Sequence, residues 1–308
     1  MGNKPEQKPE GKPEIVVFGK NGQVGHELLN ALSNIAIVHS FDMDVVDFTK
    51  EKTITATLKQ IKPDIIINAV AYTAVDKAEQ EQDLAHQVNA RGPQVIAEFA
   101  EKYNTLFIHY STDFVFDGQS DKPYLESDIP NPLSVYGSTK LAGEELVLNS
   151  GCKSIVLRTS WVYGLRGANF VLTMLRLAHK LEQMKVVDDQ LGSPVWCGYI
   201  AQTTAKIIEN LLHDSPDLSH IDENKLGLFH ITASTYTSWY GFAQAILEKD
   251  PNKKQQICHE LSPIPSSEYP TPAERPKWSV LDNSKLQSTF NLDIPSWEEQ
   301  FEQMWKKG

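Results

Sequence analysis

The chain has 308 residues, of which 41% are hydrophobic and 22% charged, a composition typical of a globular protein with a buried core. Its formal net charge of -11 disfavours binding through a broadly basic surface, so nucleic acid is not an expected partner. No apolar run is long enough to cross a bilayer, and the three cysteines, none in a C-x-x-C pair, predict neither a disulfide framework nor a zinc site. We therefore expect a cytoplasmic protein without a membrane partner.

Short apolar runs alternate with helical patterns over the first two thirds of the chain, which indicates parallel β-α units. After a Pro/Lys/Glu-rich stretch, 1–13, that predicts a disordered tail, strands are expected at 15–18, 35–38, 65–69, 106–110 and 154–157. Helices are expected at 24–32, 85–103 and 135–148. The nearly all-apolar strands are typical of a parallel sheet covered on both faces. We predict an α/β fold with a doubly wound, Rossmann-like parallel sheet and a smaller α/β lobe.

Three glycines with the spacing G-x-x-G-x-x-G lie between the first predicted strand and the first helix: Gly19, Gly22 and Gly25. Glycine permits the tight turn and the close approach of a dinucleotide pyrophosphate, which then meets the N-terminus of the helix. An acidic residue after the second strand binds the adenosine ribose in such folds. Three are candidates: Asp42, Asp44 and Asp47. A carboxylate there favours NADH and Lys20 favours NADPH, so both cofactors remain open.

These features predict an NAD(P)-binding domain over 15–160, which also receives 195–230. The alternation of short apolar runs with helical patterns changes after about residue 160, and prolines and aromatics gather near residue 270. We therefore predict that 161–194 and 231–308 form the smaller, substrate-binding lobe.

Tyr136 and Lys140 are spaced i,i+4 at the start of a predicted helix and therefore share one face. We expect the ammonium and the positive nicotinamide of the oxidised cofactor both to lower the pKa of the phenol, so that Tyr136 can protonate a carbonyl oxygen as hydride reaches its carbon. The preceding strand is followed by Ser111, Thr112 and Asp113, at the edge where doubly wound sheets bind ligands.

Several longer blocks resemble the extended short-chain dehydrogenase/reductases and, within them, the dTDP-4-dehydrorhamnose reductase family. The similarity runs from about Ile15 to near the C-terminus, and its blocks are 19–25, 68–79, 109–118, 158–163, 169–177, 189–194 and 275–276. The resemblance implies that NAD(P)H reduces the C4 keto group of dTDP-4-dehydro-L-rhamnose, a dTDP-sugar, to give dTDP-L-rhamnose.

The resemblance also implies roles for individual residues. The catalytic residues would be Thr112, Tyr136 and Lys140. The cofactor would contact the catalytic Tyr and Lys and also Gly19, Asn21, Gly22, Gln23, Val24, Gly25, Asp47, Phe48, Ala69, Val70 and Ala71. The sugar nucleotide would contact Val75, Thr112, Asp113, Trp161, Asn169 and Arg275. Trp161 would offer a flat apolar face to the sugar, and Arg275 either binds the pyrophosphate or forms a surface salt bridge.

Some members of this family bind Mg²⁺ between subunits through glutamates. Glu27 matches one such position, but the second falls on Cys197 or Gly198, neither a good Mg²⁺ ligand. We therefore expect no metal site and leave a homodimer open.

Two other functions fit the same fold. One is a non-catalytic regulatory subunit resembling that of methionine adenosyltransferase, which would bind the cofactor without consuming it. The other is a different nucleotide-sugar epimerase or reductase. A dehydratase is disfavoured because Phe114 follows Asp113, where a dehydratase typically has Glu as its acid.

Overall fold

The computed structural model describes residues 11–307, which are built around a six-stranded parallel sheet. The strand order is β10-β5-β4-β3-β1-β2. The strands are β1 Glu14–Phe18, β2 Ile37–Phe41, β3 Ile65–Asn68, β4 Leu106–Thr112, β5 Ser154–Thr159 and β10 Gly227–His230. The order reverses between β1 and β3, which confirms the expected doubly wound sheet.

The second strand lies later in the chain than its apolar run predicts. Ile35 and Ala36 form a turn in which both N–H groups donate to the carbonyl of Leu32, and β2 begins at Ile37. Because β2 is the edge strand and all of its residues are only partly buried, it continues through the polar pair His39 and Ser40.

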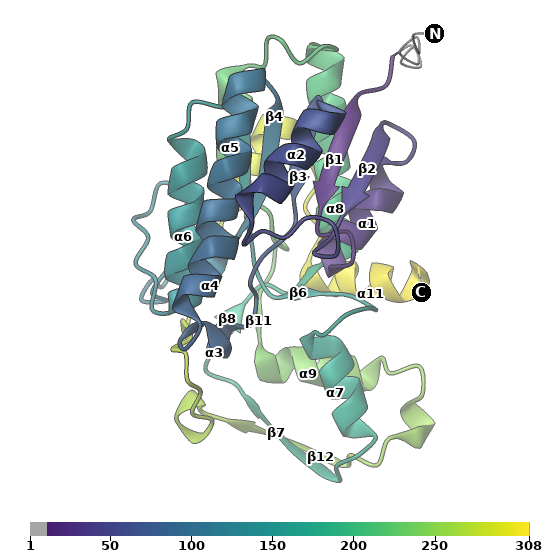
Figure 1. Ribbon diagram of the computed structural model, residues 1–308. Helices are drawn as coiled ribbons and strands as arrows, with labels where there is room; N and C mark the ends of the chain where they lie inside the picture. The colour runs from purple at the N-terminus through teal and green to yellow at the C-terminus, as the bar shows by residue number, and fades with distance from the viewer. Residues whose placement is uncertain (1–10, 308) are drawn as a thin grey trace, which may run out of the picture.

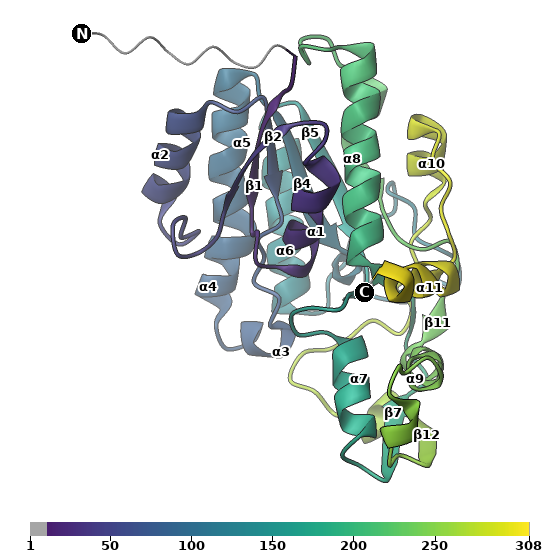
Figure 2. The same cartoon turned by 90° about the vertical axis from the view of Figure 1, so that its right-hand side faces the viewer.

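Helices cover both faces of the sheet (Figure 2). On one face lie α1 Gln23–Leu32 and α8 Cys197–Asp214; on the other lie α2 Glu51–Ile61, α5 Gly92–Tyr103 and α6 Val135–Leu148. Side chains of β1 alternate between the two cores, with Ile15 and Val17 on the α8 side and Val16 and Phe18 on the α5 side. The helix expected at 135–148 is confirmed, whereas the stretch 85–103 is divided into α4 Gln82–His86, a π-helical segment Gln87–Arg91 and α5.

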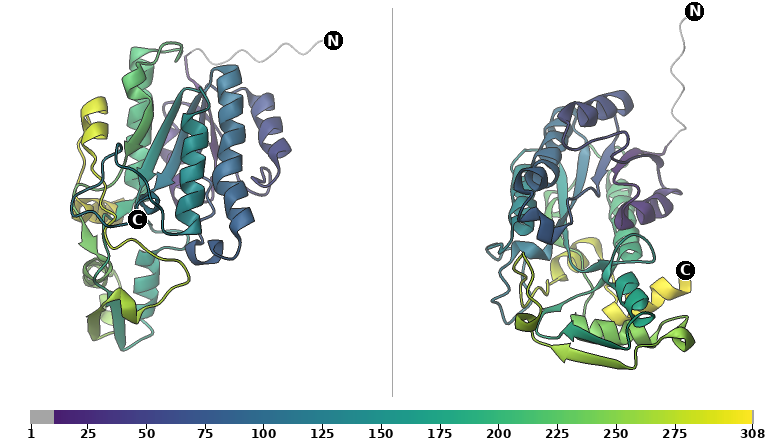
Figure 3. Two further views of the ribbon diagram at one scale, coloured as in Figure 1. Left: turned by 90° about the vertical axis from the view of Figure 1, so that its left-hand side faces the viewer. Right: turned by 60° about the horizontal axis from the view of Figure 1, so that its bottom comes forward.

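The smaller lobe lies beyond the carboxyl ends of the central strands (Figure 1). Its helices α7 Phe170–Ala178 and α9 Trp239–Glu248 pack together, and short strands pair around them. The pairs are β6 Val162–Tyr163 with β9 Val195–Trp196, β7 Gln183–Val187 with β12 Glu260–Ile264, and β8 Leu191–Gly192 with β11 Thr237–Ser238. The β7–β12 pair closes the far end of the lobe (Figures 1 and 3).

The chain crosses between the two parts more than once. Helix α8 packs on α1 and β10 joins the sheet beside β5. Helix α10 Ser284–Phe290, which falls in the range expected for the smaller lobe, instead lies against β10, with the rings of Phe290 and Phe229 5.4 Å apart. Helix α11 Trp297–Lys307 ends the described chain.

The predicted tail, 1–13, lies largely outside the described residues; those that are described, 11–13, lead into β1. Within residues 11–307, no helix combines the length and apolar character that a bilayer span requires.

Candidate active site

The glycine turn joins β1 to α1 at the reversal of strand order. Gly19 has φ +88°, and a Cβ there would lie 2.9 Å from the carbonyl carbon of Ala69. A Cβ on Gly25 would lie 1.9 Å from the carbonyl oxygen of Gly19. The N-cap of α1, Gly22, provides no side-chain cap, so no capping side chain occupies the N–H groups of the first turn. This geometry fits a dinucleotide diphosphate.

An acidic side chain contacts this turn from the neighbouring strand. Asp42 directly follows β2, and its Oδ2 accepts a hydrogen bond from the Asn21 N–H at 2.9 Å. Of the three aspartates in this zone, Asp42 therefore occupies the strand end at which a ribose-binding acid is expected.

Asp47 and Phe48, the pair predicted near the adenosine, have different environments. Hydrogen bonds from Thr49 and the Lys50 ammonium, 2.9 Å away, lower the pKa of Asp47 to about 2, so its carboxylate is charged at neutral pH. Phe48 is buried in the sheet core, edge-on to Phe18. A Cβ on Gly92 would lie 2.5 Å from the Phe48 ring, so this side chain packs under α5.

The loop that follows β3 contains three predicted cofactor residues, Ala69, Val70 and Ala71. Asn89, in the π-helical segment, accepts a hydrogen bond from the Tyr72 N–H at 2.8 Å and donates to the Tyr72 carbonyl at 3.2 Å. It also donates to Thr139 of α6 at 3.1 Å. Asn89 thus ties the loop to α6, the helix that bears Tyr136 and Lys140. Sequence periodicity did not identify it, because a π-helical turn inside a helical stretch leaves the apolar pattern nearly unchanged.

The predicted proton-donor pair lies in the first two turns of α6. Ser134 caps this helix by accepting from the Gly137 N–H at 3.1 Å, and Glu79 accepts from the Val135 N–H at 2.9 Å. A Cβ on Gly137 would lie 2.2 Å from the carbonyl oxygen of Phe114, so the helix packs closely on the turn after β4. This contact places Tyr136 against that turn, with its ring edge-on to Phe114.

The expected lowering of the phenol pKa is wrong for the chain by itself. Lys140 is buried and its Nζ donates to the main-chain carbonyl of Tyr110 at 2.6 Å. Burial lowers the pKa of Lys140 to about 8, and Glu144 opposes this shift. Burial raises the pKa of Tyr136 to about 12; its interaction with Thr112 opposes the rise and the charge of Asp113 adds to it. The phenol is therefore protonated at neutral pH, the form that donates a proton.

Thr112 and Asp113 form a small polar cluster beside Tyr136. The Thr112 hydroxyl donates to Oδ1 of Asp113 at 3.0 Å and accepts from the Phe114 N–H at 3.2 Å. Burial raises the pKa of Asp113 to about 6, although hydrogen bonds from Ser279 and Thr112 favour its carboxylate. Ser279 lies more than 160 positions further along the chain, and no local sequence pattern predicts that it meets Asp113.

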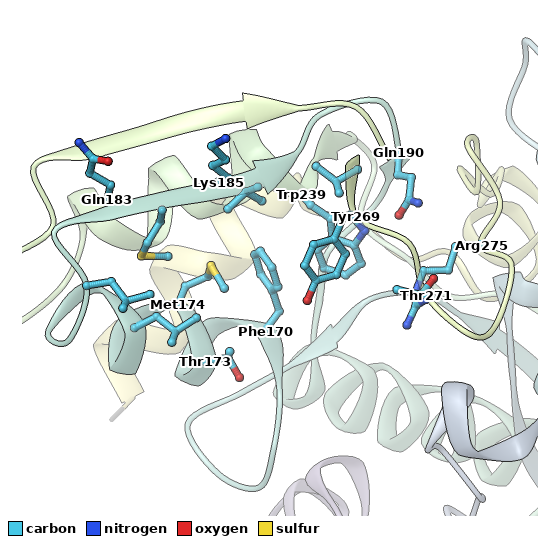
Figure 4. A pocket seen from close by; sticks show the side chains of 15 residues that line it. Phe170, Thr173, Met174, Gln183, Lys185, Gln190, Trp239, Tyr269, Thr271 and Arg275 are labelled. Atoms are coloured by element: carbon cyan, nitrogen blue, oxygen red, sulfur yellow. The ribbon is translucent and has the colours of Figure 1, made fainter. Parts of the chain in front are cut away.

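A cavity of about 440 Å³ lies in the smaller lobe between α7, β7 and the segment that follows β12 (Figure 4). Aromatic rings line its middle: Phe170, Trp239 and Tyr269. Arg275, Thr271 and Gln190 lie at one end, and Met174 and Gln183 at the other. Arg275 is the member of the predicted substrate set that lines this cavity, and its Nη2 is 2.9 Å from Oδ2 of Asp76. Arg275 therefore lies where it could bind a pyrophosphate in the cavity, and it also forms the salt bridge that was the alternative expectation.

Three other predicted substrate residues lie outside the cavity lining. Trp161 stacks on Trp239, so one of its faces is already covered. Asn169 caps α7 through the Leu172 N–H at 3.1 Å and donates to Oε1 of Gln23 at 2.9 Å, which links the lobe to the glycine turn. Val75 begins α3 Val75–Ala78.

Glu27 lies close enough to Cys197 for its charge to act on the thiol. Burial and the charge of Glu27 raise the pKa of the Cys197 thiol to about 12, which keeps the thiol protonated and a poor ligand for Mg²⁺. Residues 11–307 contain no group of three or more His, Cys, Asp or Glu side chains arranged to hold a metal ion.

Known proteins share both the sequence and the fold. The sequence pattern of the family described as RmlD substrate binding domain matches residues 13–308. The dTDP-4-dehydrorhamnose reductase of Escherichia coli K12 is 42% identical over 289 residues, which cover 92% of this chain and 94% of the relative. The crystal structure of the Bacillus anthracis dTDP-4-dehydrorhamnose reductase in complex with NADP has a TM-score of 0.85 at 33% identity, covering 96% of this chain and all of the other. The crystal structure of a Clostridium acetobutylicum protein described as a dTDP-4-dehydrorhamnose reductase has a TM-score of 0.84 at 34% identity. The match covers 96% of this chain and 99% of the other. The resemblance seen in the sequence blocks is confirmed: the chain belongs to the dTDP-4-dehydrorhamnose reductase family.

Proposed function

We propose that the protein reduces the C4 keto group of dTDP-4-dehydro-L-rhamnose to give dTDP-L-rhamnose, with NADPH or NADH as the hydride donor. The observation that carries this proposal is the convergence of the Gly19–Gly25 turn with Tyr136 and Lys140 at the carboxyl edge of one sheet. The lobe that faces this edge (Figure 1) contains an aromatic cavity with the cation of Arg275 at one end (Figure 4). The names of the relatives agree with this activity.

The glycine turn would hold the cofactor diphosphate, because the absence of a Cβ at Gly19 and Gly25 permits the tight turn that brings the N-terminus of α1 to the end of β1. Asp42 and Asp47 would flank the adenosine, since both lie between β2 and α2. The bound NAD(P)H supplies the hydride.

Tyr136 would supply the proton to the keto oxygen. Its raised pKa keeps the phenol protonated before the reaction, and the Thr112 hydroxyl beside it can hydrogen-bond the same oxygen. Lys140 would stabilise the phenolate that forms, because its ammonium is held one helical turn along α6. Its pKa of about 8 leaves most of the ammonium charged at neutral pH.

The lobe cavity would hold the nucleotide part of the substrate. Aromatic faces at Phe170, Trp239 and Tyr269 suit a thymine ring, and Arg275 suits a diphosphate through charge-assisted hydrogen bonds. A sugar attached to that diphosphate would then extend toward the sheet edge and Tyr136.

The test compares Tyr136→Phe with Tyr103→Phe, a control at the exposed end of α5. Consumption of NADPH or NADH is followed with dTDP-4-dehydro-L-rhamnose. Loss of the phenol should reduce kcat by roughly 10²–10⁴-fold, while cofactor affinity stays within a few-fold and the control matches the wild type. Full activity of Tyr136→Phe would refute the assignment of the proton donor.

The same assay separates the alternatives. A regulatory subunit would bind cofactor without ever consuming it. An epimerase would convert a nucleotide sugar without net use of added NADPH and would retain oxidised cofactor.

Within the described residues, Cys152, Cys197 and Cys258 are all free thiols, which supports a site of action in the reducing cytoplasm.

A further inference from the structure

A segment that we call the strap, residues 269–283, leads from the smaller lobe back to the central sheet. Its second half is fixed by main-chain hydrogen bonds: the Ser279 N–H donates to the Leu191 carbonyl at 2.8 Å and the Tyr124 N–H donates to the Val280 carbonyl at 2.9 Å. Its first half provides Tyr269, Thr271 and Arg275 to the wall of the lobe cavity. The first half therefore decides where the cation of the cavity lies.

A single carboxylate holds this first half to the larger domain. Oδ1 of Asp76 accepts from the Ala273 N–H at 3.2 Å, and Oδ2 accepts from Nη2 of Arg275 at 2.9 Å. Among the described residues, Asp76 is the one hydrogen-bond partner that residues 270–275 have outside their own segment. Pro270 and Pro272 have no N–H to offer, which limits the contacts the strap can make elsewhere.

The contacts also orient the guanidinium. Nη1 of Arg275 donates to the carbonyl of Ala273 at 3.2 Å, while the N–H of that same residue donates to Asp76. The three residues form a closed set of hydrogen bonds that restricts the rotamers of Arg275 yet leaves further N–H donors on its guanidinium. The hydrogen bond from Arg275 in turn lowers the pKa of Asp76, so this carboxyl is ionised at neutral pH.

Asp76 is itself well anchored. It lies in the first turn of α3, and Glu79, one residue beyond this helix, caps the N-terminus of α6 through Val135. The short segment that bears Asp76 and Glu79 is therefore fixed to α6, the helix that bears Tyr136 and Lys140. This connection sets the distance between the cavity cation and the proton donor.

We propose that Asp76 is a positioning residue for sugar-nucleotide binding, which holds Arg275 and the strap in the orientation that receives the substrate diphosphate. The inference rests on the proposed function, because it takes Arg275 as the diphosphate ligand. Ordering a mobile Arg side chain when the substrate binds costs conformational entropy and so weakens binding. Asp76 avoids this cost because it holds Arg275 in place before the substrate arrives.

The experiment measures the affinity of dTDP by calorimetry, together with KM and kcat for the keto sugar, in Asp76→Asn and Asp76→Ala. Asparagine can still accept from Ala273 but cannot pair with the guanidinium; alanine does neither. The matched control is Glu51→Gln, which breaks a comparable surface pair between Glu51 of α2 and Arg91 of the π-helical segment; neither residue lines the cavity.

The dTDP dissociation constant and KM should rise about three- to tenfold in Asp76→Ala, and less in Asp76→Asn, while kcat and NADPH affinity stay within twofold. Unchanged or tighter dTDP binding in both variants would overturn the inference, since Asp76 would then be a surface partner or a competitor of the diphosphate. A fall in kcat at constant KM would overturn it as well. If the wild type binds dTDP with this dependence on Asp76 but reduces no keto sugar, the proposed function fails while the positioning role stands.

Discussion

The indole of Trp161 lies flat on the indole of Trp239, with ring centroids 3.4 Å apart and planes inclined by 4°. Trp161 has φ +43°, a conformation that a bulky side chain rarely adopts. A Cβ on Gly192 would lie 2.5 Å from the Trp161 ring, and Phe170 contacts the other indole, so the stack is held from both sides. Trp161 lies two residues beyond β5, which pairs with β4 as far as Thr112, and Trp239 lines the lobe cavity, so the stack connects the carboxyl edge of the sheet with the cavity.

Replacing Trp239 with Phe should abolish the exciton couplet that two stacked indoles produce in far-ultraviolet circular dichroism. KM for the sugar nucleotide should rise, because Trp161 loses the partner that holds its strained backbone in place. The control is Trp278→Phe, which removes an indole that meets Tyr236 edge-on and does not stack. A couplet that survives in Trp239→Phe would mean that the two indoles are not stacked in solution.

Gly25→Ala should destabilise the fold by about 1–3 kcal/mol and prevent cofactor binding, because its Cβ would overlap the Gly19 carbonyl oxygen. Gly22→Ala is the control for stability, since a Cβ there meets the same oxygen at 3.3 Å and φ is negative. Urea unfolding and cofactor titration check both effects. Equal stability of the two variants would contradict the close approach seen at Gly25.

Asp113→Asn should stabilise the chain at neutral pH. Burial raises the pKa of this carboxyl from 3.8 in the unfolded chain to about 6 in the fold. Between these values the folded state binds more protons than the unfolded state, so this group's contribution to stability is lost as pH rises from about 4 to 6. The amide avoids that loss, which is on the order of 2–3 kcal/mol above pH ~6.

Urea unfolding of wild type and Asp113→Asn across this pH range is the measurement, and their difference should vanish at the acid end. Asp117→Asn is a control of opposite sign. Hydrogen bonds from Asn131, Gln119 and Tyr124 lower the pKa of Asp117, so its carboxylate stabilises the fold above its unfolded pKa. A pH-independent gain in Asp113→Asn would show that desolvation of the carboxylate is not the cause.

Glu144→Gln should destabilise the chain by about 3–5 kcal/mol, because it leaves a buried guanidinium without its counter-charge. Arg158 donates to both oxygens of Glu144, with Nη2 2.6 Å from Oε2, and both side chains are almost fully buried. Glu145→Gln on the exposed side of α6 should change stability by less than ~0.5 kcal/mol. Chemical denaturation measures both; similar values for the two variants would mean that other groups satisfy Arg158.

Much of the fold followed from local pattern. The strands β1 and β3 were predicted to within a residue because strands buried on both faces are apolar throughout, and α6 was predicted at its observed bounds. The spacing of Gly19, Gly22 and Gly25 predicted the turn because its steric demand acts within a few residues. Strand β2 was misplaced because its edge position, which allows His39 and Ser40, depends on the order of the other strands.

The amino-acid sequence by itself indicated five of the six strands of the central sheet, the glycine turn, the Tyr136/Lys140 pair and the family, since each depends on neighbouring residues or on blocks of them. Only the tertiary structure decided which groups are buried and which distant side chains meet. Asp76 and Arg275 are 199 positions apart, and Trp161 finds Trp239 only across the lobe. Tertiary structure also sets the pKa of the Tyr136 phenol, because burial, Thr112 and the charge of Asp113 determine it, and spacing along a helix specifies none of these.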